Sequence, residues 1–420
     1  MDTPDTHGFH GRTVMIIIVG HLANAPRVQK EAAALRRAGA RVLVRGNWFD
    51  ASLAEEDREI ARQLDVDFAP VTDFRRDGGR VADRFRHRLA RLAHDWLGQV
   101  SPRTLGPGAW ELLRAARATK ADLTVVHSEP GLWLGSKLLD EGLRVAVDFE
   151  DWFSHDQLPG DRPEDVRRLL QTLERHLLRN AHGCTTTTLV MAHALASDAG
   201  TARVPVVVPN CFTSDATTVA PVDPDPRDDS ATSFYWFSQT IGPTRGLETL
   251  AKALVRLHGN WTVHLRGSLG SHRDWFEQTF PASLRGRIHC LGPVSNAQLP
   301  ARTRGHDVGL ALELPYCENK QLTASNKIHE YLRGGLAIIA TATEGQREVM
   351  QRSPGAGLLV DAGDEAGLAD AMQAMIDEPA RLASFKAQST RAGRETWDWK
   401  VHAPRLLAAL HGAMTDVAPA

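Results

Sequence analysis

The chain has 420 residues, of which 42% are hydrophobic and 24% are charged, and its formal net charge is −2. This composition is typical of a globular protein long enough for two or three domains with apolar cores, and the near-neutral charge argues against bulk binding of nucleic acid. The cysteines Cys184, Cys211, Cys290 and Cys317 form no Cys-x-x-Cys pair, so we expect reduced thiols rather than a zinc cluster or a disulfide framework.

The beginning of the chain carries no recognisable targeting signal. Residues 1–12 are polar and lack the apolar core of a signal peptide. The apolar run at 14–19 is too short to cross a bilayer. We therefore predict a cytoplasmic protein, or one that contacts the inner face of a membrane only from the side.

Apolar runs alternate with helical segments through the first half of the chain. The predicted strands are 13–20, 40–45, 121–126, 144–148 and 202–209, and the predicted helices are 25–37 and 132–141. Fully apolar strands that alternate with helices are typical of a parallel α/β sheet. The turn at 19–24 has one glycine and no G-x-G-x-x-G, and no Walker A sequence is present, so the common dinucleotide and triphosphate fingerprints are absent.

The composition changes at 213–233, which is rich in Pro, Asp, Ser and Thr and has no periodicity. This segment predicts a linker or a long surface loop. After it the predicted strands are 234–238, 261–266, 287–291, 307–312, 337–341 and 357–360, with helices at 247–257, from Asn326, and over 365–413. The whole pattern predicts an α/β protein of two doubly wound domains with a cleft between them.

The segment 325–335, SNKIHEYLRGG, predicts a short helix with a lysine in an unfavourable place. Lys327 lies in the first turn, where the helix dipole disfavours a cation. This helix follows a strand, and ligands of open α/β sheets bind beyond the carboxyl ends of the strands. A phosphate between Lys327 and the helix amides, with Glu330 accepting from ribose hydroxyls, would explain the pattern and indicates a nucleotide. The alternative is a surface Lys and Glu on a helix whose apolar side faces the core.

A second cation has a similar position. Arg245 in SQTIGPTRGLE (238–248) stands just before the first helix of the second domain. Two cations at neighbouring helix N-termini suit a diphosphate better than one phosphate. The alternative is a Gly/Pro turn with an exposed arginine.

These segments resemble the group 1, or family 4-like, glycosyltransferases. SNKIHEYLRGGLAIIATATEGQREVM is similar to the family's Lys-x-x-Glu-Tyr, Gly, apolar strand and Gly-x-x-Glu-Val pattern, and SQTIGPTRGLE is similar to its Gly-Arg…Lys-Gly loop. The resemblance is specific over about 234–350. Before that it rests on HLANAPRVQKEAAALRRAGARVLV, ADLTVVHSE and VDFEDWF.

The resemblance implies a GT-B fold, in which two Rossmann-like domains face a central cleft. The implied domains are 1–212 for the acceptor and 234–395 for the donor, joined by the linker 213–233, with a last helix at about 396–420 that crosses back to the first domain. Arg245 and Lys327 would bind the diphosphate and Glu330 the ribose. The implied donor-binding residues are Thr240, Gly242, Arg245, Gly246, Gly292, Val294, Ser325, Asn326, Lys327, Glu330, Glu344 and Gln346.

Two positions depart from the family pattern. The E-x7-E motif needs a carboxylate at position 322, which is Leu322, and the nearest candidates are Glu318 and Glu313. Thr240 stands where many members have an arginine. These departures leave the donor sugar and the stereochemistry of transfer unassigned.

The first domain supplies the candidate catalytic residues. His127, Glu150 and Asp151 follow two predicted strands, where His127 could bind the transferred sugar and a carboxylate could orient or deprotonate an acceptor hydroxyl. The alternative is a satisfied histidine and a capped turn. The candidate acceptor-side residues are Gly20, His21, Asn24 and Arg27.

Two further segments have weaker interpretations. Residues 80–97 form a basic amphipathic pattern that would touch an anionic membrane or pack on its own domain. Asp65 and Asp67 match the D-x-D of metal-dependent transferases, but so short a match arises readily by chance.

We therefore predict a glycosyltransferase that moves a sugar from a nucleotide diphosphate sugar to an acceptor hydroxyl in glycan, glycolipid or glycosylated metabolite synthesis. We expect no metal and no further cofactor, because Arg245, Lys327 and two helix dipoles can neutralise the leaving diphosphate. The alternatives are a sugar-nucleotide epimerase or hydrolase of the same fold, or a degenerate nucleotide-sugar-binding subunit, which Leu322 would suit. The base, the sugar, the acceptor and the oligomeric state stay open.

Overall fold

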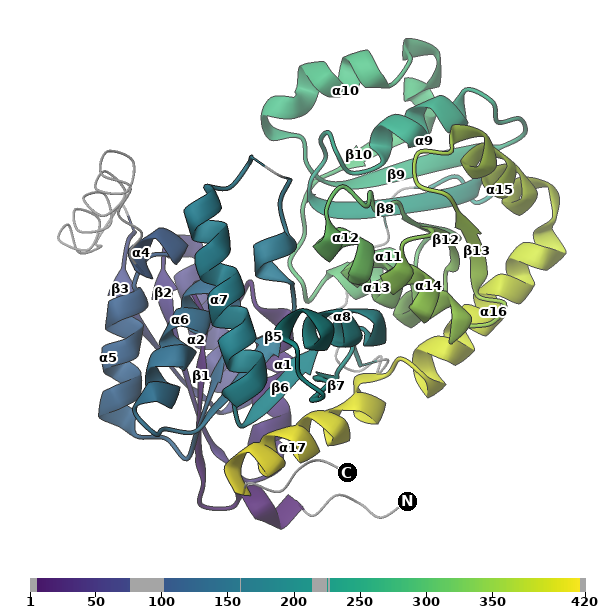
Figure 1. The fold of residues 1–420 in the computed structure, drawn as a ribbon. Coiled ribbons are helices and arrows are strands. Elements are labelled where there is room, and N and C mark those ends of the chain that lie inside the picture. Colours follow the sequence, from purple (N-terminus) through teal and green to yellow (C-terminus); the bar gives the residue numbers. More distant parts are fainter. Residues whose placement is uncertain (1–5, 76–101, 159, 214–224, 226, 416–420) are drawn as a thin grey trace. The chain divides into compact units, whose positions relative to one another are not determined.

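The computed structural model describes residues 6–75, 102–158, 160–213, 225 and 227–415 (Figure 1). The chain forms two compact units, one of Met1–Val208 with Ala403–Ala420 and the other of Pro209–His402. The predicted basic helix at 80–97 and most of the predicted linker lie outside the described residues. Within the described part, no helix is long and apolar enough to span a membrane.

The first unit contains a seven-stranded parallel sheet in the order β3-β2-β1-β4-β5-β6-β7. Its strands are β1 (Thr13–Ile17), β2 (Arg41–Trp48), β3 (Asp67–Asp73), β4 (Leu123–Val126), β5 (Val145–Phe149), β6 (Gly183–Thr186) and β7 (Val206–Val207). Every residue of β4, β5 and β6 is buried, as expected for central strands covered on both faces. The strand order reverses between β1 and β4, so the loops after these strands flank the switch point where α/β sheets bind ligands.

The helices of the first unit follow its strands along the chain. They are η1 (Thr6–Phe9), α1 (Pro26–Arg37), α2 (Ala51–Leu64), α4 (Pro102–Leu105), α5 (Ala109–Thr119), α6 (Ser128–Asp140), η2 (Phe153–His155), α7 (Glu164–Asn180) and α8 (Leu189–Ala199). Pro26 begins α1, a position where the missing N–H has no intrahelical acceptor and where the fixed φ of proline suits a helix. This start directs Arg27 and Glu31 of α1 into the buried interior.

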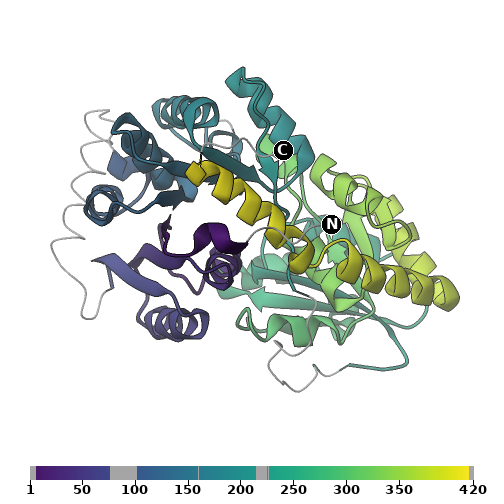
Figure 2. The same ribbon diagram turned by 90° about the horizontal axis from the view of Figure 1, so that it is seen from below.

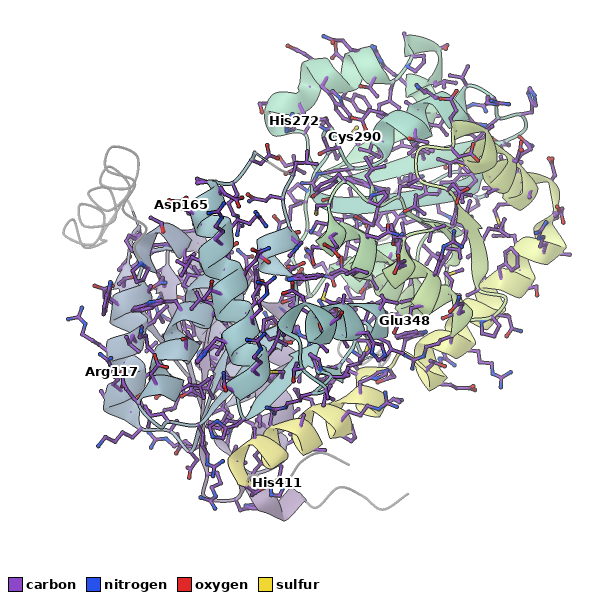
Figure 3. All side chains as sticks on the ribbon, viewed as in Figure 1. Arg117, Asp165, His272, Cys290, Glu348 and His411 are labelled. Atoms are coloured by element: carbon purple, nitrogen blue, oxygen red, sulfur yellow. The ribbon has the colours of Figure 1, made fainter. Side chains whose placement is uncertain are left out.

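The end of the chain packs on the first unit. The last helix, α17 (Trp399–Thr415), joins this unit from Ala403 onward (Figures 1 and 2). An Arg144 guanidinium nitrogen donates to the carbonyl of Ala413 at 3.1 Å, and the His411 ring lies 5.9 Å from that of Phe9. Figure 3 labels His411 on α17. The first unit is therefore completed by a segment that comes after the whole second unit in the sequence.

The second unit contains a six-stranded parallel sheet in the order β10-β9-β8-β11-β12-β13. Its strands are β8 (Thr232–Thr240), β9 (Trp261–Ser268), β10 (Ile288–Leu291), β11 (Val308–Ala311), β12 (Ala337–Thr341) and β13 (Gly357–Val360). The order reverses between β8 and β11, which makes the loops after these two strands the switch point of this sheet.

The helices of the second unit are α9 (Leu247–Leu254), η4 (Gly270–His272), α10 (Arg273–Thr279), η5 (Ala282–Arg287), α11 (Leu299–Thr303), α12 (Glu318–Leu322), α13 (Asn326–Gly334), α14 (Glu344–Gln351), α15 (Glu365–Asp377) and α16 (Pro379–Glu395). Trp236, Trp261 and Phe280 are among the largest side chains of the core cluster, which α9 and α15 help to cover. The predicted α/β fold of two doubly wound, Rossmann-like units is confirmed.

Candidate functional site

The loops at the switch point of the second unit are held close together by a glycine. Gly246 has φ +75°, and a Cβ atom there would lie 2.5 Å from the carbonyl oxygen of Leu312. Gly246 ends the loop after β8, and Leu312 follows β11. A side chain at position 246 would push these two loops apart, so the glycine is needed for both its backbone conformation and the close approach.

Three helices begin at this edge of the sheet. Ser325 caps α13 by accepting from the Lys327 amide at 3.2 Å, and Thr343 caps α14. A Cβ atom on Gly345 would lie 2.4 Å from the carbonyl oxygen of Thr323, so α14 begins against the segment that leads into α13. α9 also begins here, after the loop that ends at Gly246. The N-termini of three helices therefore lie at this edge of the sheet, and their dipoles favour an anion.

Lys327 has a carboxylate partner in this structure. Its Nζ lies 2.5 Å from Oε1 of Glu313 and 5.7 Å from the centre of the Trp236 ring. Burial by itself would raise the pKa of Glu313, but the nearby ammonium of Lys327 outweighs it and the pKa lies below its usual value. The ion pair therefore compensates for a lysine that its own helix dipole disfavours.

The other cation is more accessible. Arg245 is exposed, and one of its guanidinium nitrogens donates to Oγ of Ser238 at 2.9 Å. It stands one residue before Gly246, at the N-terminus of α9. Arg245 therefore precedes α9 and Lys327 begins α13, the helices that follow the switch-point strands β8 and β11.

The remaining predicted donor residues divide into edge and core positions. Glu330 is buried one turn inside α13 and pairs with Arg333 at 3.5 Å. Gln346 is fully buried and donates to the carbonyl oxygens of Ala311 and Thr341, so it ties β11 to β12. Thr240 ends β8, and Gly242 packs against the His272 ring. Asn326 begins α13 and Glu344 begins α14. Gly292 and Val294 follow the edge strand β10.

Leu322, at the family's glutamate position, is buried at the end of α12. Glu318 begins that helix, whereas Glu313 lies beside Lys327. Sequence reasoning named Glu313 only as a substitute for the missing carboxylate. Glu313 and Lys327 lie at the two ends of the connection between β11 and α13, and no local sequence pattern indicates that they pair.

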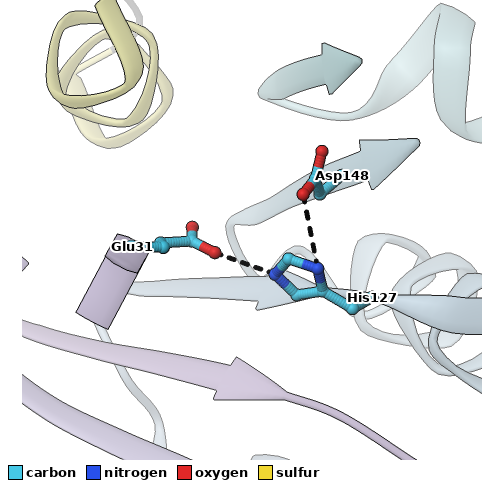
Figure 4. Close-up of side chains that lie close together, drawn as sticks. All are labelled: Glu31, His127 and Asp148. Carbon is cyan, nitrogen blue, oxygen red and sulfur yellow. Dashed lines mark hydrogen bonds and ion pairs between the residues drawn. The ribbon is translucent and has the colours of Figure 1, made fainter. Parts of the chain in front are cut away.

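The first unit has a buried charged cluster at its own switch point (Figure 4). The guanidinium of Arg27 donates to both oxygens of Asp148 and to the carbonyl of Val208. His127 lies between two carboxylates, with Nε2 2.9 Å from Oε2 of Glu31 and Nδ1 3.4 Å from Oδ2 of Asp148. Sequence reasoning identified Arg27 and His127 but assigned no role to Glu31 or Asp148.

The carboxylates of the cluster shift the pKa of His127. Burial lowers the pKa of His127, but the carboxylates of Glu31 and Asp148 raise it more, so the net shift is upward. Facing a carboxylate on each side, the ring can donate from both nitrogens only as an imidazolium. Asp148 responds in the opposite sense: burial raises its pKa, and Arg27 and His127 lower it below its usual value.

The ligand atoms of Glu31, His127 and Asp148 lie within 4.8 Å of one another, as a metal site would require. The imidazole ring, however, stands between the two carboxylates and turns one nitrogen to each. Arg27 also engages both oxygens of Asp148, and a metal cation beside a guanidinium would be repelled. We therefore interpret the cluster as an ion network.

The other predicted residues of the first unit follow β1 and β5. Glu150 and Asp151 follow β5, and burial raises the pKa of Glu150. His21 is buried. Its Nε2 accepts from the amides of Phe49 and Asp50, and its Nδ1 lies 2.7 Å from Oδ2 of Asp57. The ring therefore stabilises the turn after β2. Asn24 is exposed, and Gly20 has open space around its Cα.

The D-x-D residues have structural partners. Asp65 ends α2 in a left-handed conformation and pairs with Arg36. Asp67 begins β3 and pairs with Arg45 at 3.1 Å. Each carboxylate is therefore engaged by an arginine of another element.

Two Rossmann-like units, each with a doubly wound parallel sheet, define a fold of the GT-B type. Residues 233–378, within the second unit, match the family described as glycosyl transferases group 1. The narrower family 4-like assignment stays a prediction. No curated protein matches the sequence.

Solved structures share the fold over nearly the whole chain. HepE of Anabaena, solved with UDP-glucose, has a TM-score of 0.69 and 15% identity, covering 95% of this chain and 99% of HepE. TarM of S. aureus has a TM-score of 0.67 and 6% identity, with 97% and 99% covered. A Listeria monocytogenes protein assigned as a UDP-N-acetylglucosamine 2-epimerase has a TM-score of 0.59 and 11% identity, with 97% and 98% covered. At these identities the likeness establishes the GT-B fold.

Proposed function

We propose that this glycosyltransferase moves a sugar from a UDP-sugar to a hydroxyl group of its acceptor. The observation that carries the proposal is the switch point of the second unit, where Arg245 precedes α9 and Lys327 begins α13. This edge lies within the matched glycosyltransferase domain. HepE, with the same fold, was solved with UDP-glucose and with UDP, which supports uridine as the base.

In this mechanism the second unit stabilises the leaving group. Transfer breaks the bond between the sugar and the diphosphate, and negative charge develops on the departing UDP. The exposed Arg245, the ammonium of Lys327 and the amides that begin α9 and α13 can neutralise that charge. We propose on this basis that donor activation needs no metal ion and no further cofactor.

The first unit would supply the proton acceptor. Each ring nitrogen of His127 already lies beside a carboxylate, Glu31 on one side and Asp148 on the other. A carboxylate with a raised pKa is matched to proton transfer near neutrality, and burial raises the pKa of Glu150. We propose Glu150, with Asp151 next to it in the sequence, as the candidate base and His127 as a residue that holds Glu31 and Asp148 in place.

A panel of UDP, GDP, CDP and dTDP in a thermal-shift experiment tests the donor class. A ligand that binds only the folded protein raises the melting temperature by an amount set by its concentration and Kd. We expect UDP to give the largest rise and Lys327→Ala to reduce it. Equal shifts for all four nucleotides, or none, would contradict the proposal. Conversion of a UDP-sugar to its epimer without an acceptor would favour the epimerase alternative.

A further inference from the structure

The lysine of the proposed donor site already has an anion beside it. Glu313 lies two residues beyond β11, where its backbone amide donates to Ala311 and its carbonyl accepts from Thr341 at 2.7 Å. These bonds fix the backbone so that the carboxylate reaches Nζ of Lys327 at 2.5 Å. The side chains are 25% and 14% exposed respectively, so solvent screens the pair only in part.

The position of Glu313 has a consequence for any phosphate that Lys327 binds. A phosphate oxygen that accepts from the same ammonium would lie within about 5 Å of the Glu313 carboxylate, given hydrogen bonds of about 2.8 Å on each side. Like charges at this separation, in a partly buried site, repel strongly enough to change an affinity by about tenfold or more. Phosphate binding is weakened in either case. If Glu313 stays in place, its carboxylate repels the phosphate; if it turns away, its ion pair with Lys327 is lost.

We propose that Glu313 sets the affinity of the donor site: its carboxylate holds Lys327 in the empty site, and a donor diphosphate must displace it or bind against its charge. The inference rests on the proposed function and concerns the same site. In the free protein the ion pair keeps the lysine ordered at a helix end that repels it. After transfer, recapture of Lys327 by Glu313 favours the release of UDP.

Calorimetric titration of UDP into the wild-type protein and into Glu313→Gln tests this role. Glutamine keeps the size and an acceptor oxygen for the lysine but removes the charge, so we expect UDP to bind about tenfold more tightly. Uridine has no phosphate, and its affinity should not change. A variant that merely loosened the site would change the binding of both ligands.

Asp307→Asn serves as a matched control. Asp307 precedes β11, at the opposite end of the strand from Glu313, and pairs with Lys386 at 2.6 Å. The substitution Asp307→Asn removes the same charge from a similar pair of lysine and carboxylate. We expect this variant to bind UDP with wild-type affinity. Glu313→Ala should also tighten UDP binding. Agreement between the two variants would show that the effect comes from removal of the carboxylate and not from the glutamine side chain.

The outcomes separate the two proposals. If the wild-type protein binds UDP but Glu313→Gln binds it equally or more weakly, Glu313 orients the lysine and the inference is overturned. If Asp307→Asn tightens binding as much as Glu313→Gln, only net charge matters and the inference also fails. If the wild-type protein binds no nucleoside diphosphate, the proposed function itself fails and the inference falls with it.

Discussion

Replacement of Glu174 by glutamine is expected to stabilise the protein at alkaline pH. Glu174 lies on α7 and is fully buried, where its carboxylate accepts from the amide of Ser154 at 3.0 Å and from Oγ of the same residue at 2.5 Å. Burial is the largest influence and raises the pKa of Glu174 from 4.5 to about 7, although the bonds from Ser154 lower it. The folded protein therefore retains a proton that the unfolded chain loses.

The sign and size of the effect follow from this difference. Because the folded-state pKa is the higher one, the contribution of Glu174 to the free energy of unfolding is fully present below about pH 4.5. It falls as the pH rises and is lost above about pH 7. A rise from 4.5 to about 7, at about 1.36 kcal/mol per pH unit, corresponds to about 3 kcal/mol. Glutamine has no charge to bury, so Glu174→Gln avoids this loss.

Chemical denaturation at pH 5 and pH 8 measures the effect. We expect Glu174→Gln to be close to wild type at pH 5 and more stable by up to about 3 kcal/mol at pH 8. Glu164→Gln is the control, because Glu164 begins the same helix but is paired with Arg167 and Arg168 at the surface. Equal or lower stability of Glu174→Gln at pH 8 would refute the reasoning, and so would a similar gain in Glu164→Gln.

Two further substitutions test the donor site. Lys327→Ala is expected to weaken UDP binding about tenfold or more in a calorimetric titration. The melting temperature of the free protein should fall only slightly, because removal of a cation from a helix N-terminus offsets part of the lost ion pair with Glu313; a large fall with unchanged UDP affinity would indicate a structural role. Gly246→Ala is expected to cost about 2 kcal/mol or more in denaturation and to weaken UDP binding, because its Cβ would lie 2.5 Å from the carbonyl oxygen of Leu312; wild-type stability and affinity in this variant would show that the loops separate at no cost.

Strands with continuous apolar sequence could be predicted from the sequence, and strands of other composition could not. β12 and β13 begin and end where the apolar runs do. β6 consists of Gly183, Cys184 and two threonines, all buried, and no apolar run identifies it. β3 contains Pro70 and lies at the sheet edge, where a proline is tolerated, so its sequence resembles a loop.

The placement of Arg245 and Lys327 at helix N-termini could also be predicted from the sequence, because helix starts after strands carry local signals. The charged partners of these candidate residues could not be predicted from the sequence. Arg27 and Asp148 are separated by 121 positions, and Lys327 and Glu313 are joined across a long loop. The Arg27–Asp148 pair depends on which strands are neighbours, and the Lys327–Glu313 pair depends on the path of the connection between β11 and α13. Both are properties of the tertiary structure. For this reason His127 could be named as a candidate from the sequence, but not the two carboxylates beside it.

The account is tested most directly by following the sugar itself. Radiolabelled UDP-sugars would be incubated with the protein and a glycan and lipid extract, and both the label and the released UDP would be measured. The account predicts label in a new covalent product with an equal amount of UDP, and loss of both in Lys327→Ala. UDP-sugars that are returned unchanged, or converted to an epimer without release of UDP, would contradict it.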